Sequence, residues 1–176
     1  MKTQKRRRRE NKTDYNIRMK LLKSDVPRII FRKSNRYIIA QYVVSNEARD
    51  SIITGITSKI LLKHGWPEDM EGSLKSLPAS YLTGFILGKN ITEKKLETPI
   101  IDIGMIRNVG KNRVFSFIKG LIDAEVKIKC REESFPNEEK IKGKNLKRDF
   151  SVLFTKIKGK IAGEKNSTTI ERVKIK

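Results

Sequence analysis

The stretch that decides the fold is "PRIIFRKSNRYIIAQYVVS", residues 27–45. Two apolar runs, residues 29–31 and 37–44, flank a polar group of five residues, 32–36. Because β-branched and aromatic residues stand on both sides of a short turn containing Ser and Asn, the pattern predicts a β-hairpin. A turn requires only the Ser and the Asn, yet three of the five tip residues are cationic. We therefore expect the tip to have a second role.

Side chains alternate between the two faces of a strand, so the second strand of the hairpin has two distinct faces. One face, expected to form the core, carries Ile38, Ala40, Tyr42 and Val44. The other carries Tyr37, Ile39, Gln41 and Val43. A β-branched run with a glycine inside it, "SIITGIT" at residues 51–57, predicts the next strand of a meander.

Helical and strand signals alternate in the middle of the chain. "SLPASYLTGFILGKN" at 76–90 predicts a helix capped by Ser76, with Pro78 in its first turn and with Gly84 and Gly88 packed closely on the sheet. The almost wholly apolar "TPIIDIG" at 98–104 is typical of a strand covered on both faces, and "NRVFSFIKGLIDAEVKI" at 112–128 repeats apolar residues at helical spacing. A shorter helix is expected to end at Gly65.

These signals predict an α/β fold, in which a mixed sheet opens with an antiparallel hairpin and meander and helices pack on the sheet. Basic extensions are expected at both ends. We divide the chain into a basic N-terminal arm and helix at 1–24, an α/β core at 25–131 and a basic C-terminal extension at 132–176.

Charge is the strongest compositional signal, with 40 Lys and Arg against 20 Asp and Glu. Residues 1–36 hold 14 basic and 3 acidic residues, or +11, whereas residues 37–136 hold 14 and 12, or +2. Residues 137–176 hold 12 and 5, or +7. The run "KRRRRE" at 5–10 favours a nucleic acid partner over a merely solvated surface. No Trp or Phe interleaves the run, which argues against a membrane-surface helix.

The chain is expected to be soluble, unexported and cytoplasmic. No window approaches the roughly 18–20 consecutive apolar residues of a membrane span, and the N-terminus begins with charge instead of an apolar signal sequence. The single cysteine, Cys130, cannot form an internal disulfide, which fits a reducing compartment.

Few residues suggest catalysis, and we predict no catalytic residue, metal, cofactor or small-molecule substrate. His64 is the only histidine and is expected to be packed or on the surface; Trp66 is expected in a small apolar cluster instead of a base-stacking platform. The alternative is a Mg²⁺-dependent nuclease built on Asp102, with Asp123 or Glu125 as companion ligands. We expect Asp102 to be a turn or cap residue instead, because the sequence offers no clear third carboxylate. A generic basic RNA chaperone is the other alternative.

Seven fragments in order resemble one known family: "RRRRENKTDYNIRMKLLKS", "PRIIFRKSNRYIIAQ", "HGW", "LPASYLTGFILG", "IDIG", "VFSFIKGLIDA" and "KIKGKNLKRDF". Over about residues 5–150 the chain is similar to the archaeal form of large-subunit ribosomal protein eighteen, the counterpart of eukaryotic large-subunit protein five. The resemblance implies binding to 5S rRNA and 23S rRNA in the central protuberance of the large subunit. It also implies neighbouring ribosomal proteins, including the other 5S-binding protein, as partners.

The family's K-S-N-K/R pattern falls on residues 33–36, with Gln41 later on the same strand; Ile39 stands where the family commonly has a basic or aromatic residue. The residues that we expect to contact RNA are Lys5, Arg6, Arg7, Arg8, Arg9, Lys12, Tyr15, Arg18, Lys20, Lys23, Arg28, Arg32, Lys33, Ser34, Asn35, Arg36, Tyr37 and Gln41. The tail "STTIERVKIK" at 167–176 is expected to end as a strand.

Overall fold

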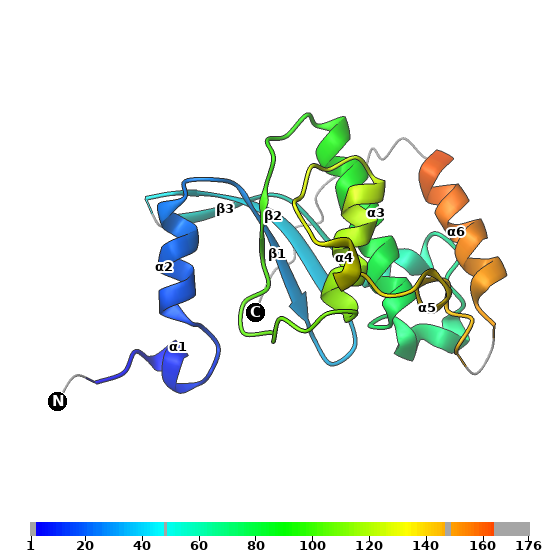
Figure 1. Cartoon of the computed structure of the whole chain (residues 1–176), viewed down its shortest axis with the longest axis horizontal. Coiled ribbons are helices and arrows are strands. Elements are labelled where there is room, and N and C mark those ends of the chain that lie inside the picture. The colour runs from blue at the N-terminus through cyan, green and yellow to red at the C-terminus, as the bar shows by residue number, and fades with distance from the viewer. Residues whose placement is uncertain (1–2, 48, 147–148, 164–176) are drawn as a thin grey trace.

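The computed structural model describes residues 3–47, 49–146 and 149–163. A sheet lies beside a group of helices, and two N-terminal helices stand apart from that group at the far end of the sheet (Figure 1). The strands are β1 (Arg28–Lys33), β2 (Ile38–Asn46), β3 (Arg49–Thr57) and β4 (Ile100–Asp102). The α-helices are α1 (Arg6–Arg9), α2 (Tyr15–Lys23), α3 (Leu77–Glu93), α4 (Arg113–Asp123), α5 (Glu138–Lys142) and α6 (Ser151–Gly163). The 3-10 helices are η1 (Ser58–Leu62), η2 (Glu68–Ser73) and η3 (Glu132–Ser134).

The sheet is mixed and has the strand order β3-β2-β1-β4. β1 and β2 form the predicted antiparallel hairpin, β3 continues it as a meander, and β4 returns parallel to β1. The return follows α3, as expected for a parallel pair, which needs a long crossover between its strands. The predicted α/β class with a mixed sheet and packed helices is confirmed.

The core lies between the sheet and helices α3 and α4. Ile29 and Phe31 of β1 are buried on this face, opposite Tyr42 and Ala40 of β2. The ring of Phe31 lies 5.0 Å from that of Phe117 in α4, so the sheet and the helices share one apolar interior.

The predicted core face of β2 is right for Ile38, Ala40 and Tyr42 but wrong for Val44. Val44 is 37% exposed, whereas Val43 on the other face is 1% exposed. The β2–β3 ladder changes register between Tyr42 and Val43. This change of register interrupts the strict alternation of faces on which the prediction depended. At that end the two strands extend beyond α3 and α4 toward α2 (Figure 1).

β4 was expected to be covered on both faces, and this expectation is wrong. Within the part of the chain that the structure describes, β4 pairs only with β1 and forms an edge of the sheet. Ile100 and Ile101 are only half-buried, because one side of an edge strand has no neighbouring strand. A short apolar run therefore does not distinguish an edge from the centre of a sheet.

Helix α3 begins as predicted. The Ser76 side chain caps it by accepting a hydrogen bond from the Ala79 N–H, and Pro78 occupies the first turn. Its glycines, however, approach another helix and not the sheet. A Cβ on Gly84 would lie 2.2 Å from the Phe117 carbonyl oxygen of α4, and a Cβ on Gly120 of α4 would lie 2.2 Å from the Tyr81 carbonyl oxygen of α3. The expected helix-on-sheet role of Gly84 and Gly88 is thus corrected to helix-on-helix packing.

The C-terminal helix α6 packs into the same core. Its buried side chains are Phe154, Ile157 and Ile161, spaced three and four residues apart, and Phe150 just before it is also buried. Phe150 in turn lies 4.5 Å, ring to ring, from Trp66. Trp66 is 2% exposed, which confirms a core role for this side chain. The strand expected at 167–176 lies outside the described residues, and the proposed domain boundaries stay predictions.

Because α3 and α4 approach so closely, we expect a single added methyl group at their contact to reduce the stability of the fold strongly. Gly84→Ala should lower the free energy of unfolding by about 1–3 kcal/mol or more, because the new Cβ meets a backbone atom that cannot rotate away. Gly159→Ala is the matched control, since a Cβ there meets nothing within 4 Å in an exposed part of α6. The control should gain about 0.5–1 kcal/mol from helix propensity. Urea denaturation of the two variants measures both effects, and an unchanged Gly84→Ala midpoint would contradict the packing.

Candidate nucleic-acid interface

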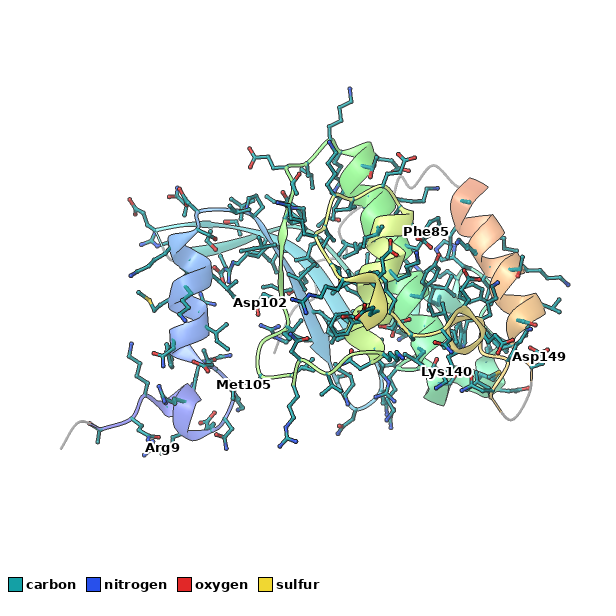
Figure 2. All side chains as sticks on the ribbon, in the orientation of Figure 1. Arg9, Phe85, Asp102, Met105, Lys140 and Asp149 are labelled. Atoms are coloured by element: carbon teal, nitrogen blue, oxygen red, sulfur yellow. The ribbon has the colours of Figure 1, made fainter. Side chains whose placement is uncertain are left out.

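The N-terminal arm, residues 5–23, presents its cations to solvent. All four arginines of α1 are exposed, and α1 buries no residue. Figure 2 shows the labelled Arg9 in the part of the arm that lies away from the sheet. A single helical turn of like charges gains nothing from its own packing. The cations of the arm are therefore accessible to a polyanion.

Local contacts order the second half of the arm. The Asp14 carboxylate caps α2 by accepting hydrogen bonds from the backbone N–H groups of Asn16 and Ile17. The Lys5 ammonium lies 4.7 Å from the centre of the Tyr15 ring, a cation–π contact that keeps this lysine near the start of α2. Tyr15 is consequently engaged by a cation of the arm itself. Lys20 and Lys23 are exposed farther along α2.

The tip of the β1–β2 hairpin is closed by Ser34. Its hydroxyl donates to the Tyr37 carbonyl oxygen at 2.8 Å and accepts from the Tyr37 N–H at 2.9 Å. Asn35 uses its backbone oxygen to accept from the Lys75 ammonium at 2.7 Å, so its exposed side-chain amide is not needed for the turn. Lys33 and Arg36 are exposed and form no ion pair among the residues that the structure describes.

Arg32, the third cation of the tip, has a structural task. Its guanidinium donates to the Asp102 carboxylate at 3.1 Å and to the Asp102 backbone oxygen at 2.9 Å. The carboxylate also accepts from the Gly104 N–H at 2.8 Å, which confirms the expected turn role of Asp102. Gly104 has φ +62°, and a Cβ there would lie 2.8 Å from the centre of the Arg32 guanidinium. The glycine thus lets the turn approach the arginine closely.

Arg28 was expected to contact RNA, but the structure places it in the interior. It is 1% exposed, and its guanidinium donates to Ser45 at 2.7 Å and to the Asp50 carboxylate at 2.8 Å. The Asp102 carboxylate lies 3.6 Å from its other terminal nitrogen. Because a buried charge needs such partners, Arg28 belongs to the framework of the sheet and is not available to a phosphate.

Two further residues on the expected RNA list are also engaged or partly covered. The Tyr37 hydroxyl donates to the Glu71 carboxylate at 2.8 Å, and this hydrogen bond raises the pKa of Tyr37 above its usual value. Gln41 is half-buried on the sheet face opposite the helices and stands beside Gly55 of β3. The best exposed positions of the hairpin are therefore residues 33–36.

Sequence reasoning did not identify the role of Asp50. Its carboxylate accepts from Arg18 of α2 at 3.0 Å as well as from Arg28 and the Ser45 hydroxyl. No short sequence motif indicates these contacts, because the partners of Asp50 lie 32, 22 and 5 residues away along the chain. The sheet register, which pairs Ser45 with Asp50, and the position of α2, which carries Arg18, bring them together.

The nuclease alternative needs converging carboxylates, and the structure separates them. Asp102 is paired with two arginines, whereas Asp123 at the end of α4 accepts from the Tyr81 hydroxyl and lies 3.4 Å from the Lys119 ammonium. Within the described residues, no group of three or more His, Cys, Asp or Glu side chains could hold a metal ion. Burial raises the pKa of the Cys130 thiol, the opposite of what a nucleophilic cysteine requires.

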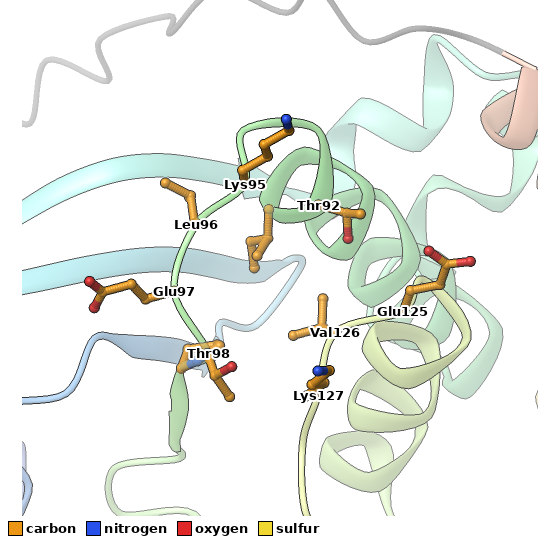
Figure 3. Close-up of a pocket in the computed structure, with 10 residues that line it drawn as sticks. Thr92, Lys95, Leu96, Glu97, Thr98, Glu125, Val126 and Lys127 are labelled. Atoms are coloured by element: carbon orange, nitrogen blue, oxygen red, sulfur yellow. The ribbon is translucent and has the colours of Figure 1, made fainter.

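A pocket of about 240 Å³ lies elsewhere, between the end of α3, the segment leading to β4 and the segment after α4 (Figure 3). Its lining mixes charges of both signs, Lys95 and Lys127 with Glu97 and Glu125. Without an excess of either sign, it is not part of the cationic surface formed by the arm and the hairpin tip.

Comparisons with known proteins identify the family of this chain. The chain matches the family model described as "Ribosomal large subunit proteins 60S L5, and 50S L18" over residues 1–99. It is 38% identical over 141 residues to large ribosomal subunit protein uL18 of Korarchaeum cryptofilum, covering 80% of this chain and 70% of that protein. The uL18 proteins of Methanoculleus marisnigri and Natronomonas pharaonis are 40% and 38% identical over 141 residues, with 78% and 74% of their lengths covered.

The fold, the cationic surface and these similarities define a structural, non-enzymatic protein of the large ribosomal subunit. Within that class, the chain belongs to the family of large-subunit proteins 60S L5 and 50S L18 and is of the archaeal type. The resemblance found in the sequence motifs is confirmed. Binding of ribosomal RNA and a role in translation are consistent with this family. Among the described helices, none has the length and apolar character needed to span a membrane.

The contacts of Asp50 predict how stability depends on pH. Burial raises the pKa of Asp50, but hydrogen bonds from Ser45 and Arg18 and the charges of Arg18 and Arg28 outweigh it, so the pKa lies below the ordinary 3.8. A carboxylate with a lowered pKa stabilises the fold fully above the unfolded-state pKa, and this contribution is lost as the pH falls through the folded-state pKa.

The test compares urea unfolding of the wild type and Asp50→Asn from neutral pH downward. The wild type's advantage should be constant at neutral pH, begin to shrink as the pH approaches 3.8 and disappear below that. An advantage that persists unchanged at lower pH, while both proteins still fold, would show that the Asp50 charge is not its source.

Proposed function

We propose that this protein binds 5S rRNA and fastens it to 23S rRNA in the central protuberance of the large subunit of the cytoplasmic ribosome. The observation that carries the proposal is the pair of exposed cationic regions, the arm at residues 5–23 and the hairpin tip at 33–36, on a chain of the L5/L18 family. Neighbouring ribosomal proteins, including the other 5S-binding protein, are its proposed protein partners. In this proposal the protein binds no cofactor and no small-molecule substrate and does not associate with a membrane.

Phosphate contacts supply most of the binding in this proposal. Contacts from Lys and Arg to phosphates position a protein without reading the bases, and structured RNA is recognised largely by shape. The proposed phosphate contacts come from the exposed arm and tip cations, Lys5, Arg6, Arg7, Arg8, Arg9, Lys12, Lys20, Lys23, Lys33 and Arg36. Arg6 and Lys12 lie 3.8 and 2.9 Å from the Glu10 carboxylate, but this pairing is local and leaves both side chains exposed. Arg18, Arg28 and Arg32 bind the carboxylates of Asp50 and Asp102 in the sheet and are left out of this set.

Selectivity for a particular RNA rests on few polar groups. The Ser34 hydroxyl already donates and accepts within the turn, so its remaining capacity is small. The Asn35 side-chain amide is exposed and offers donors and an acceptor. We therefore assign the main hydrogen-bonding role at the tip to Asn35, with Gln41 on the open face of the sheet as a secondary contributor.

Salt dependence tests the electrostatic part of the proposal. A protein that neutralises about 6–10 phosphates of a duplex loses on the order of 10³–10⁵ in affinity between 50 and 200 mM salt. Filter binding of 5S rRNA across this range should show a comparably steep decline. Competition with random duplex RNA of equal length should leave 5S rRNA bound, whereas equal competition would favour the generic RNA chaperone. A nearly flat salt dependence would overturn the electrostatic account.

The hairpin tip gives a more local test. Replacing both Lys33 and Arg36 with Ala should change the free energy of unfolding by no more than about 0.5 kcal/mol, because Ser34 still closes the turn. The same change should weaken 5S rRNA binding and reduce the salt slope by roughly 2, since each lost phosphate contact lowers it by about 1.

The control for the tip removes two other exposed lysines, Lys94 at the C-terminal end of α3 and Lys127, which lines the pocket of Figure 3. It changes the net charge equally and should leave most of the affinity and slope intact. Thermal melts accompany all binding curves. If both double variants melt normally and weaken binding by the same amount, the tip has no special contact with RNA.

A further inference from the structure

Alternating charges cross the sheet between the two proposed RNA-binding regions. The arm's Arg18 binds Asp50 of β3, which binds Arg28 of β1. Arg28 faces Asp102 of β4, and Asp102 binds Arg32 next to the hairpin tip. We call these five residues the ion-pair row. Figure 2 labels Asp102 beside the sheet, between the arm and the helices.

The middle of the ion-pair row is rigid. Arg28 is 1% exposed, and strand pairing fixes its backbone opposite Val43 and Ile100. Asp50 is held by this guanidinium at 2.8 Å and by the Ser45 hydroxyl at 2.7 Å. The Asp50 oxygen that faces Arg18 is therefore in a defined position relative to the sheet.

The arm end of the ion-pair row is loosely packed. Helix α2 buries no residue, and its apolar side chains Ile17 and Met19 are 45% and 53% exposed. The Arg18 guanidinium bonds Asp50 at 3.0 Å, and both side chains are partly covered, at 35% and 27% exposure. With so little apolar burial, a directed ion pair has a large share in setting the direction of α2.

An acidic residue next to a cationic RNA surface repels phosphate, so Asp50 should weaken binding if it only contributed charge. From these contacts we infer that Asp50 is a positioning residue, which holds the N-terminal arm in the orientation that RNA requires by fixing Arg18 to the sheet. The inference rests on the proposed RNA-binding function. Its structural half, the orientation of the arm, concerns the free protein and can be tested without RNA.

Distances between two spin labels test the orientation of the arm in the free protein. Labels at Lys20→Cys in α2 and Lys63→Cys after η1, in a Cys130→Ser background, report the arm against the body. Asp50→Asn and Arg18→Met should each broaden the distance distribution, because each breaks the same contact from a different side. Arg18→Met leaves Asp50 bound to Arg28 and Ser45, so it keeps the test valid if Asp50→Asn folds poorly. Glu47→Gln, in the β2–β3 turn just before the strand that carries Asp50 and without an ion pair among the described residues, should leave the distribution narrow.

The effect of arm orientation on RNA binding is tested by the ratio of the affinities for 5S rRNA and for random duplex RNA. If Asp50→Asn leaves the arm in its binding orientation in about one molecule in ten, 5S rRNA affinity falls about tenfold. Random duplex should bind Asp50→Asn as well as, or better than, the wild type, since a negative charge is gone. Glu47→Gln should raise the affinities for both RNAs by the same factor and leave their ratio unchanged.

Two results would overturn the inference. One is a distance distribution that stays narrow in both Asp50→Asn and Arg18→Met. The other is an Asp50→Asn protein whose affinities change in parallel, as in Glu47→Gln. If the wild type itself shows no preference for 5S rRNA, the proposed function fails, and the distances still decide whether Asp50 positions the arm.

Discussion

The buried guanidinium of Arg28 is the constraint on which the proposed RNA-binding side of this protein depends. A charge with 1% exposure must be matched within the protein. Its partners come from β3 and β4, the two outer strands of the sheet. One buried charge therefore fixes carboxylates at both edges of a four-stranded sheet, and those carboxylates in turn hold the arginines nearest to the arm and the hairpin tip.

The opposite side of the sheet is organised by shape. Helices α3 and α4 approach so closely that glycines face backbone carbonyls at Gly84 and Gly120. This pair covers Ile29, Phe31, Ala40 and Tyr42, and α6 extends the same core around Trp66. Apolar packing thus forms the core on one face of the sheet, whereas paired charges on the other face connect the elements that are proposed to bind RNA.

The cations of the chain belong to two groups that composition alone cannot separate. Arg18, Arg28 and Arg32 are bound by carboxylates, whereas Lys33, Arg36 and the arginines of α1 remain exposed. Sequence patterning predicted the hairpin, the cap at Ser76 and the helices around Phe85 and Phe117, because these depend on local periodicity and on nearby backbone donors. It misjudged Val44, β4 and Gly84, because their surroundings come from distant segments.

The sequence by itself determined the α/β class, the location of charge at the two ends and the family, since periodicity, composition and short motifs are properties of neighbouring residues. The tertiary structure alone decided which cations face solvent. Arg28 and Lys33 are equivalent in a list of basic residues, yet pairing of β1 with β2 and β4 buries the first and leaves the second at the tip. Asp50 gained its contacts in the same way, because only the strand register places it between Arg18 and Arg28.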